Sequence, residues 1–169
     1  RWSLAAAYRV LGKPEYLDAA IRARDYIIDH FIDHEQGGVY WSVDYLGQPF
    51  DTKKQTYAIG FVIYGMSELA RATGDKKALD AAVATAKNIM ATEINAAGSG
   101  AAFECWYHGA ARETEPAYHM LETCVTTTWL RFCQTLLALT RDPLYADQIE
   151  KTLYNAFLAA LSYDATTFS

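Results

Sequence analysis

Apolar residues recur at helical spacing along most of the chain, in pairs of segments separated by a short turn. This spacing on both sides of each turn predicts two antiparallel helices per pair. One short pattern marks the turns and occurs three times, over Leu11 to Ala20, Thr73 to Ala82 and Thr140 to Ile149. The predicted helices lie near residues 1–11, 14–32, 54–73, 76–93, 124–139 and 143–161. We therefore expect three helical hairpins.

The turn residues support these hairpins. Gly12 and Gly74 can adopt the positive φ that ends a helix. Asp75 and Asp142 are suited to cap the helices that follow. Pro143 fits a first helical turn, where its missing N–H is not needed. Each repeat therefore reads as a helix, a tight turn and a returning helix.

The two helices of a hairpin differ in polarity. The first is more apolar, as in Tyr57 to Tyr64, whereas the second carries regular charges such as Arg22, Arg24 and Asp25. This difference predicts buried inner helices covered by half-solvated outer helices. Such an arrangement is an (α/α) toroid, and three hairpins make about half of the usual six. We expect an all-α fold, with residues 1–169 as a single toroid-like domain.

Two long links join the hairpins, and loops of this length in a compact domain are usually functional or disordered. Residues 33–53 contain Gly37 to Asp44 and then Gly47, a pattern that predicts a short β-hairpin. Residues 95–116 begin with small residues typical of flexible segments. They then become aromatic and acidic from Phe103 onward.

Charge and composition exclude several classes of protein. A net charge of -5 without a basic cluster argues against a nucleic-acid partner. No apolar run approaches the roughly 20 residues that span a bilayer, so no membrane partner is expected. Three cysteines are too few and too scattered for a disulfide framework. No signal peptide is visible, and although the chain looks cut at both ends, we expect a cytoplasmic protein.

Glu122, Thr123 and Cys124 place a carboxylate and a thiol two residues apart at a predicted helix start. Their side chains can serve one site only if the helix begins near Cys124, with Thr123 or Glu122 as N-cap. A thiol there lies at the positive end of the helix dipole, which favours its thiolate as nucleophile or metal ligand. The alternative is a helix cap followed by a small buried thiol.

Residues 2 to about 93 resemble the N-acylglucosamine and cellobiose 2-epimerase family. The matching stretches are Trp2 to Arg9, Gly37 to Asp44 and Lys54 to Ala58. The resemblance implies an (α/α)6 barrel whose histidines epimerise a sugar at C2 without a metal. The family's catalytic histidines belong to later helices, and no matching segment follows in this sequence.

Residues 103 to about 164 resemble a different toroid family, the zinc-dependent β-L-arabinofuranosidase type of glycoside hydrolase. The matching stretches are Phe103 to Trp106, Glu122 to Trp129 and Tyr145 to Asn155. The resemblance implies zinc as cofactor, with Glu122 and Cys124 as ligands. Cys124 would also be the nucleophile, and Glu104 the general acid/base.

The segment 103–119 contains further candidates for binding zinc or a sugar. That family also uses a vicinal cysteine pair, which this sequence does not contain. Cys105 could substitute as a third zinc ligand, with His108 and His119 as alternative donors; each histidine could equally be a solvated loop residue. Trp106 and Tyr107, with His108 beside them, could bind a sugar ring through flat apolar faces with polar tips. Packing of the loop onto the helices is an equally good interpretation of these aromatic residues.

The two resemblances meet at residues 95–102, which we interpret as a seam. The chain would then be a fused half-toroid or a fragment of an unusual relative. The leading functional interpretation is a glycoside hydrolase with a carbohydrate substrate. The alternatives are a sugar 2-epimerase and a non-catalytic helical fragment. Because half a toroid leaves inner helices uncovered, we also expect a homo-oligomer.

Overall fold

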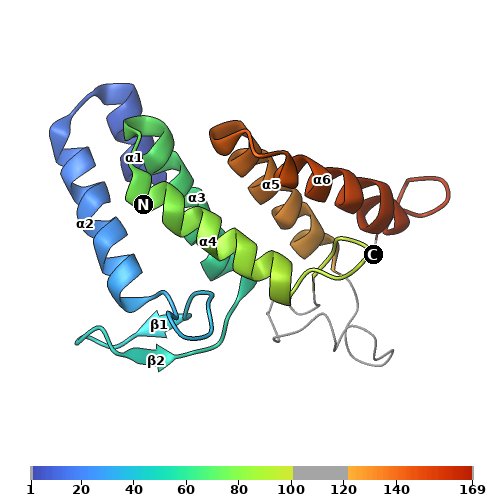
Figure 1. Cartoon of the computed structure of the whole chain (residues 1–169), viewed down its shortest axis with the longest axis horizontal. Coiled ribbons are helices and arrows are strands. Elements are labelled where there is room, and N and C mark those ends of the chain that lie inside the picture. The colour runs from blue at the N-terminus through green and yellow to red at the C-terminus, as the bar shows by residue number, and fades with distance from the viewer. Residues whose placement is uncertain (1, 101–121, 169) are drawn as a thin grey trace. The chain divides into compact units, whose positions relative to one another are not determined.

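The computed structural model describes residues 2–100 and 122–168, and most of them are helical (Figure 1). The helices are α1 (Trp2–Leu11), α2 (Pro14–His30), α3 (Thr56–Thr73), α4 (Lys76–Thr92), α5 (Thr123–Thr140) and α6 (Pro143–Thr152). A π-helical turn, Leu153–Phe157, continues α6. The all-α class is confirmed, and the helix ends lie close to the predicted ones, except that the last helix changes its winding. None of the helices described here is both long and apolar enough to cross a membrane.

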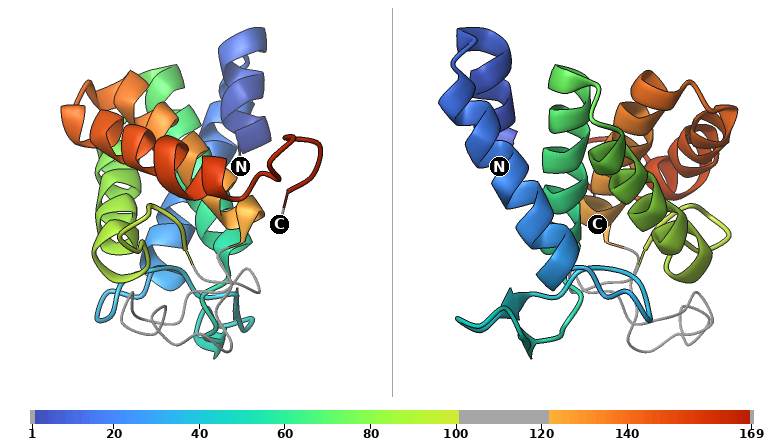
Figure 2. Two further views of the ribbon diagram at one scale, coloured as in Figure 1. Left: turned by 90° about the vertical axis from the view of Figure 1, so that its right-hand side faces the viewer. Right: turned by 60° about the vertical axis from the view of Figure 1, so that its left-hand side comes forward.

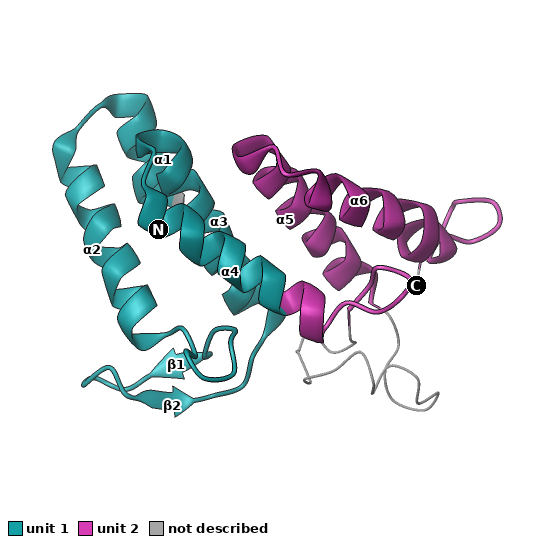
Figure 3. Cartoon of the chain, in the orientation of Figure 1, with its two compact units in different colours: residues 1–88 teal, residues 89–169 magenta. Residues whose placement is uncertain are grey.

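The chain divides into two compact units, residues 1–88 and 89–169 (Figure 3). The first unit holds α1, α2, α3, most of α4 and a small sheet. The second holds the last turn of α4, then α5, α6 and the π-helical turn. The division lies a few residues before the stretch where the two sequence resemblances meet.

In the first unit, α1 packs against both α2 and α3. Figure 2 gives two more views of the α1–α2 and α3–α4 hairpins. The turn after α3 is closed by Gly74, which adopts a φ of 74° and ends the helix in the left-handed conformation. Two ion pairs join α2 to the start of α4, Arg24 with Asp75 and Asp25 with Lys77. The second hairpin is therefore fixed to the first at its turn.

The expected β-hairpin is present between α2 and α3. Strands β1 (Ser42–Val43) and β2 (Pro49–Asp51) pair antiparallel, with Ser42 opposite Asp51. The Asp44 carboxylate accepts hydrogen bonds from the backbone N–H groups of Leu46 and Gln48, at 2.8 and 2.9 Å. The connecting turn is thus organised by an aspartate side chain.

A buried ion pair fixes the loop between α2 and this sheet. The Lys54 ammonium donates to the Asp33 carboxylate at 2.8 Å and also to the carbonyl of Gly37. Asp33 further accepts the backbone N–H groups of Glu35 and Gln36. Burial opposes ionisation of Asp33, but these hydrogen bonds and the lysine outweigh it and lower the pKa of its carboxyl. The loop therefore closes around a charged group that is fully paired.

The second unit is built on the third hairpin. Its turn contains Arg141 in the left-handed conformation, with a φ of 58°, where the other two hairpins use glycine. Asp142 caps α6 by accepting the Leu144 N–H at 3.0 Å. The largest buried side chains here are Trp129 of α5 and Tyr145 of α6. They lie in the core of the unit together with Val125, Phe132 and Leu136.

The expected difference in polarity within hairpins holds for two of the three pairs. The helices α3 and α5 contribute many buried residues, whereas α6 contributes Tyr145 and Thr152. Helix α1 differs, because its final residues Val10 and Leu11 are exposed. The prediction that the first helix of every pair is buried is therefore wrong for α1.

Candidate functional site at the start of helix α5

Helix α5 begins within the Glu-Thr-Cys motif. Thr123 is its first residue, and Glu122 is the N-cap, with an extended backbone (φ -85°, ψ 128°). The Glu122 side chain makes no capping hydrogen bond to the helix. Cys124 is the second helical residue and is exposed. The carboxylate and the thiol therefore flank the point where extended chain becomes helix, as the sequence predicted.

A buried pair of hydroxyl groups supports this helix start. The carbonyl of Glu122 accepts two hydrogen bonds from Thr126, one from its N–H and one from its hydroxyl, both of 3.0 Å. The Ser99 hydroxyl oxygen lies 2.5 Å from the Thr126 hydroxyl oxygen. Ser99 is 0% exposed and Thr126 is 2% exposed. The backbone of Glu122 is thus linked to a segment 23 residues earlier in the chain.

That segment, residues 95–99, is a tight turn. The N–H of Asn95 bonds the carbonyl of Ser99 at 2.9 Å, and the N–H of Ser99 bonds the Asn95 side chain at 3.0 Å. Gly98 and Ser99 are buried. The start of this link, expected to be flexible, is thus a hydrogen-bonded turn with two buried residues. Small residues at Gly98 and Ser99 allow this close packing.

The close packing is against the end of α6. Thr152 donates its hydroxyl proton to the carbonyl of Gly98 at 2.9 Å, and the N–H of Ala156 bonds the carbonyl of Ala97 at 3.2 Å. Gly98 has a φ of 88°, and a side chain there would meet the backbone of Thr152. The stretch Tyr145 to Asn155, which carried part of the hydrolase resemblance, thus supplies the wall on which this turn rests.

Several predicted site residues lie outside the described residues. These are the acid/base Glu104, the sugar-binding candidates Trp106, Tyr107 and His108, and the alternative donors Cys105 and His119. Their roles stay predictions. Cys133, predicted to belong to the core, is buried in α5, and this burial raises the pKa of its thiol to about 12. It is therefore a neutral packing residue.

The donors of the motif suit zinc by type. Thiolate and carboxylate are both common zinc ligands, and a zinc site takes three or four protein ligands. Glu122 and Cys124 would supply two of these. Within residues 2–100 and 122–168 no group of three or more histidine, cysteine or acidic side chains is placed to hold a metal. Zinc binding therefore stays a prediction that depends on further donors.

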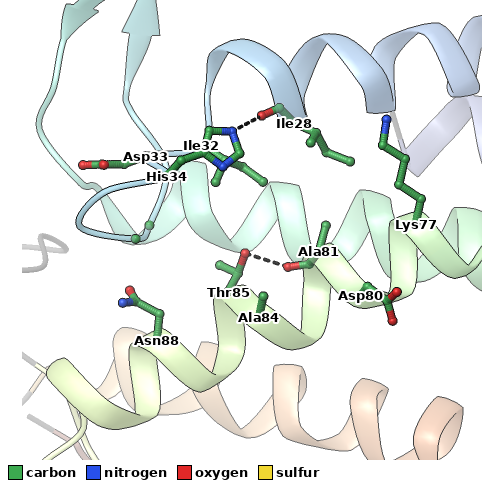
Figure 4. Close-up of a pocket in the computed structure, with 12 residues that line it drawn as sticks. Ile28, Ile32, Asp33, His34, Lys77, Asp80, Ala81, Ala84, Thr85 and Asn88 are labelled. Carbon is green, nitrogen blue, oxygen red and sulfur yellow. Dashed lines mark hydrogen bonds between the residues drawn. The ribbon is translucent and has the colours of Figure 1, made fainter.

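The first unit contains a cavity of about 420 Å³ that the sequence analysis did not identify (Figure 4). Its lining is mixed. Ile28 of α2 and Ile32, just after that helix, face Ala81 and Ala84 of α4, and charged side chains such as Lys77 also line it. The His34 ring at its rim bonds the carbonyl of Ile28 at 2.8 Å. The sequence signal for this cavity was the helical spacing of small residues on α4, such as Ala81 and Ala84. Of the described site residues, neither Glu122 nor Cys124 lines this cavity.

Comparison with known proteins relates each part of the chain to carbohydrate enzymes. Cellobiose 2-epimerase of Bacteroides fragilis is 63% identical over 82 residues, 48% of this chain and 21% of that protein. Non-reducing end beta-L-arabinofuranosidase of Bifidobacterium longum is 28% identical over 113 residues, 65% of this chain and 17% of that protein. Both resemblances expected from the sequence are confirmed. The chain spans about a fifth of the length of each of these relatives.

The structure of cellobiose 2-epimerase from Bacillus thermoamylovorans B4167 matches 99% of this chain and 45% of that one, with a TM-score of 0.82 and 24% identity. This likeness confirms the toroid type of fold. The family model for beta-L-arabinofuranosidase, GH127 catalytic domain, matches residues 2–169. The chain therefore belongs to the family of the beta-L-arabinofuranosidase GH127 catalytic domain.

Proposed function

We propose that this chain is the part of a glycoside hydrolase of the β-L-arabinofuranosidase type that contains Glu122 and Cys124. One observation carries the proposal. The start of α5 presents an exposed thiol at Cys124, two residues after the N-cap Glu122, at the point where extended chain becomes helix. The family match over residues 2–169 favours hydrolysis as the chemistry of this site. The substrate would be a carbohydrate with an arabinofuranosyl group.

Retaining cleavage needs a nucleophile for the anomeric carbon and an acid for the leaving oxygen. In this proposal the Cys124 thiolate forms a carbon–sulfur bond as the glycosidic carbon–oxygen bond breaks, and Glu104 gives its proton to the departing oxygen. Water then takes the sugar from sulfur and returns a proton to Glu104. Bound zinc would hold the thiol deprotonated at neutral pH. Glu122 and Cys124 are the described residues that would bind it.

The test is to measure zinc content together with release of arabinose from an arabinofuranoside. We expect about one zinc per chain and measurable hydrolysis, both lost in Cys124→Ala. Cys133→Ala is the matched control, because it removes a thiol from the same helix nine residues away in the core. It should keep zinc and turnover while it lowers stability. A wild-type chain that holds no zinc and releases no sugar would contradict the proposal.

A second candidate is a 2-epimerase of the cellobiose type. The observation in its favour is the 63% identity of 82 residues to the Bacteroides fragilis enzyme. This function predicts exchange of the C2 proton of cellobiose with solvent deuterium in the presence of a chelator. Proton NMR would detect the exchange. If the chain is folded and helical but shows neither hydrolysis nor proton exchange, the non-catalytic interpretation remains.

A further inference from the structure

We propose that Ser99 and Thr126 are positioning residues that fix the Glu122–Cys124 site through a directed chain of hydrogen bonds. This inference rests on the proposed function for the identity of the site. The chain of bonds runs from the turn at residues 95–99, through two buried hydroxyls, to the N-cap carbonyl of α5. It involves neither a ligand side chain nor a residue outside the described part of the molecule.

The direction of the bonds follows from counting protons. The Thr126 hydroxyl has one proton, and it donates this proton to the Glu122 carbonyl at 3.0 Å. In the proposed arrangement Ser99 is then the donor in the 2.5 Å contact between the two hydroxyl oxygens. The other acceptor near the Ser99 hydroxyl, the carbonyl of Gly100, is farther away at 3.4 Å. The order is therefore Ser99 to Thr126 to Glu122.

Burial separates Thr126 from the other threonines of α5. Thr127 also bonds the carbonyl four residues earlier, at 2.8 Å, but it is exposed, and such bonds are ordinary for threonine in a helix. Thr126 has an additional partner, Ser99, and neither hydroxyl is reached by water. A buried hydroxyl that loses its partner is costly, so this pair restricts where the N-cap residue can lie.

The anchor of the chain lies at α6. Because Thr152 bonds the carbonyl of Gly98, the turn that carries Ser99 cannot shift along α5 without breaking that bond as well. The N-cap backbone is thereby tied to two helices. This fixes the backbone positions of Glu122 and Cys124. A metal site tolerates little displacement of its ligands. We infer that the two donors are held in place before any metal binds.

The test compares Thr126→Val with Thr127→Val, because both remove a threonine hydroxyl bonded to the carbonyl four residues earlier. The first readout is amide hydrogen exchange of the first turn of α5 in the metal-free chain. Thr126→Val should speed this exchange about fivefold, the effect of one lost hydrogen bond of about 1 kcal/mol, whereas Thr127→Val should not change it. Ser99→Ala should reproduce the effect. Equal exchange in the two valine variants would overturn the inference.

The second readout is the Co²⁺–thiolate absorption band, titrated with Co²⁺ in place of zinc. Thr126→Val and Ser99→Ala should weaken Co²⁺ binding about tenfold, as supporting residues of metal ligands do, and Thr126→Ser should restore it. A merely structural threonine would leave the band unchanged. If the wild-type chain shows no band, the proposed function fails, and with it the positioning of metal ligands. The exchange measurement still decides separately whether the two hydroxyl groups order the start of α5.

Discussion

The hydroxyl of Thr152 donates a hydrogen bond to the carbonyl oxygen of Gly98, 54 residues earlier in the chain, at 2.9 Å. Thr152 is fully buried, so the bond is closed to water. It joins the end of α6 to the turn that leads, through Ser99, to the start of α5. The stretch Tyr145 to Asn155 therefore contributes to the candidate site by supporting it from behind.

We predict that Gly98→Ala strongly destabilises the chain. Its φ of 88° disfavours any side chain, and a Cβ would lie 2.7 Å from the Cα of Thr152. The positive φ alone costs about 1 to 2 kcal/mol, and the backbone clash adds to it. Gly74→Ala is the matched control, since Gly74 has a φ of 74° with nothing within 4 Å of the added carbon. Urea unfolding should show the larger loss for Gly98→Ala, and equal losses would contradict the contact with Thr152.

Lys54→Met should destabilise the first unit by about 3 kcal/mol, because it leaves the buried Asp33 carboxylate without its cation. The neighbouring Lys53 is the control. It is half exposed, lies 3.4 Å from Asp51 and sits 4.9 Å from the centre of the Trp41 ring. Lys53→Met should cost less than about 1 kcal/mol. Chemical denaturation of both variants measures the difference, and similar losses would show that burial of the Asp33 pair does not matter.

Stability should fall in acid as two carboxylates become protonated. Hydrogen bonds from Arg24 and then Lys77 lower the pKa of Asp25 to about 2, and the pKa of Asp33 is also lowered. In the unfolded chain an Asp has its ordinary pKa of about 3.9. Between about pH 4 and pH 2 the unfolded chain therefore binds more protons than the folded chain. The stabilisation is thus complete above about pH 4 and is lost as pH falls towards about 2.

Denaturant midpoints measured between neutral pH and pH 2 test this dependence. Lys54→Met should reduce the contribution of Asp33 to the pH dependence of the midpoint, because the Asp33 carboxyl then loses the cation that favours its ionisation. A midpoint that does not change on acidification would show that these carboxylates have the same pKa in the folded and unfolded chain.

The two cysteines of α5 should differ in reactivity. Cys124 is exposed, whereas burial raises the pKa of Cys133 to about 12, so Cys133 has almost no thiolate at neutral pH. Iodoacetamide should modify Cys124 in the native chain and Cys133 only after unfolding in urea. Mass spectrometry of the peptides separates the two positions. Native modification of Cys133 at a comparable rate would contradict its place in the core.

Much of the fold follows from local signals that the sequence states directly. Asp142 and Pro143 mark the start of α6 and Gly74 the end of α3, because capping and positive φ depend on residues within one turn. Arg141 shows that the repeat can keep its turn without glycine. The sequence also placed the start of α5 within the Glu-Thr-Cys motif, since the N-cap requirement is local.

What the sequence did not reveal depends on contacts between distant residues. The small residues before Gly100 suggested flexibility, because composition alone does not distinguish a loose chain from one pressed against a helix. Only the hydrogen bonds between Ser99 and Thr126 and between Thr152 and Gly98 identify the second case. The π-helical turn after Thr152 was likewise invisible, since its apolar spacing also fits an α-helix.

A homo-oligomer stays a prediction, and the exposed face of α3 is where it can be tested. Tyr57, Phe61 and Tyr64 are spaced to share one face of the helix, and Phe61 is 70% exposed. Apolar faces of this kind often mark association sites. Light scattering at micromolar concentration should give twice the 18.9 kDa mass of the chain. Phe61→Gln should return the monomer mass, whereas Tyr163→Gln, which changes an exposed aromatic residue of the other unit, should not. A wild-type monomer under these conditions would mean that the aromatic face of α3 does not bind a second copy.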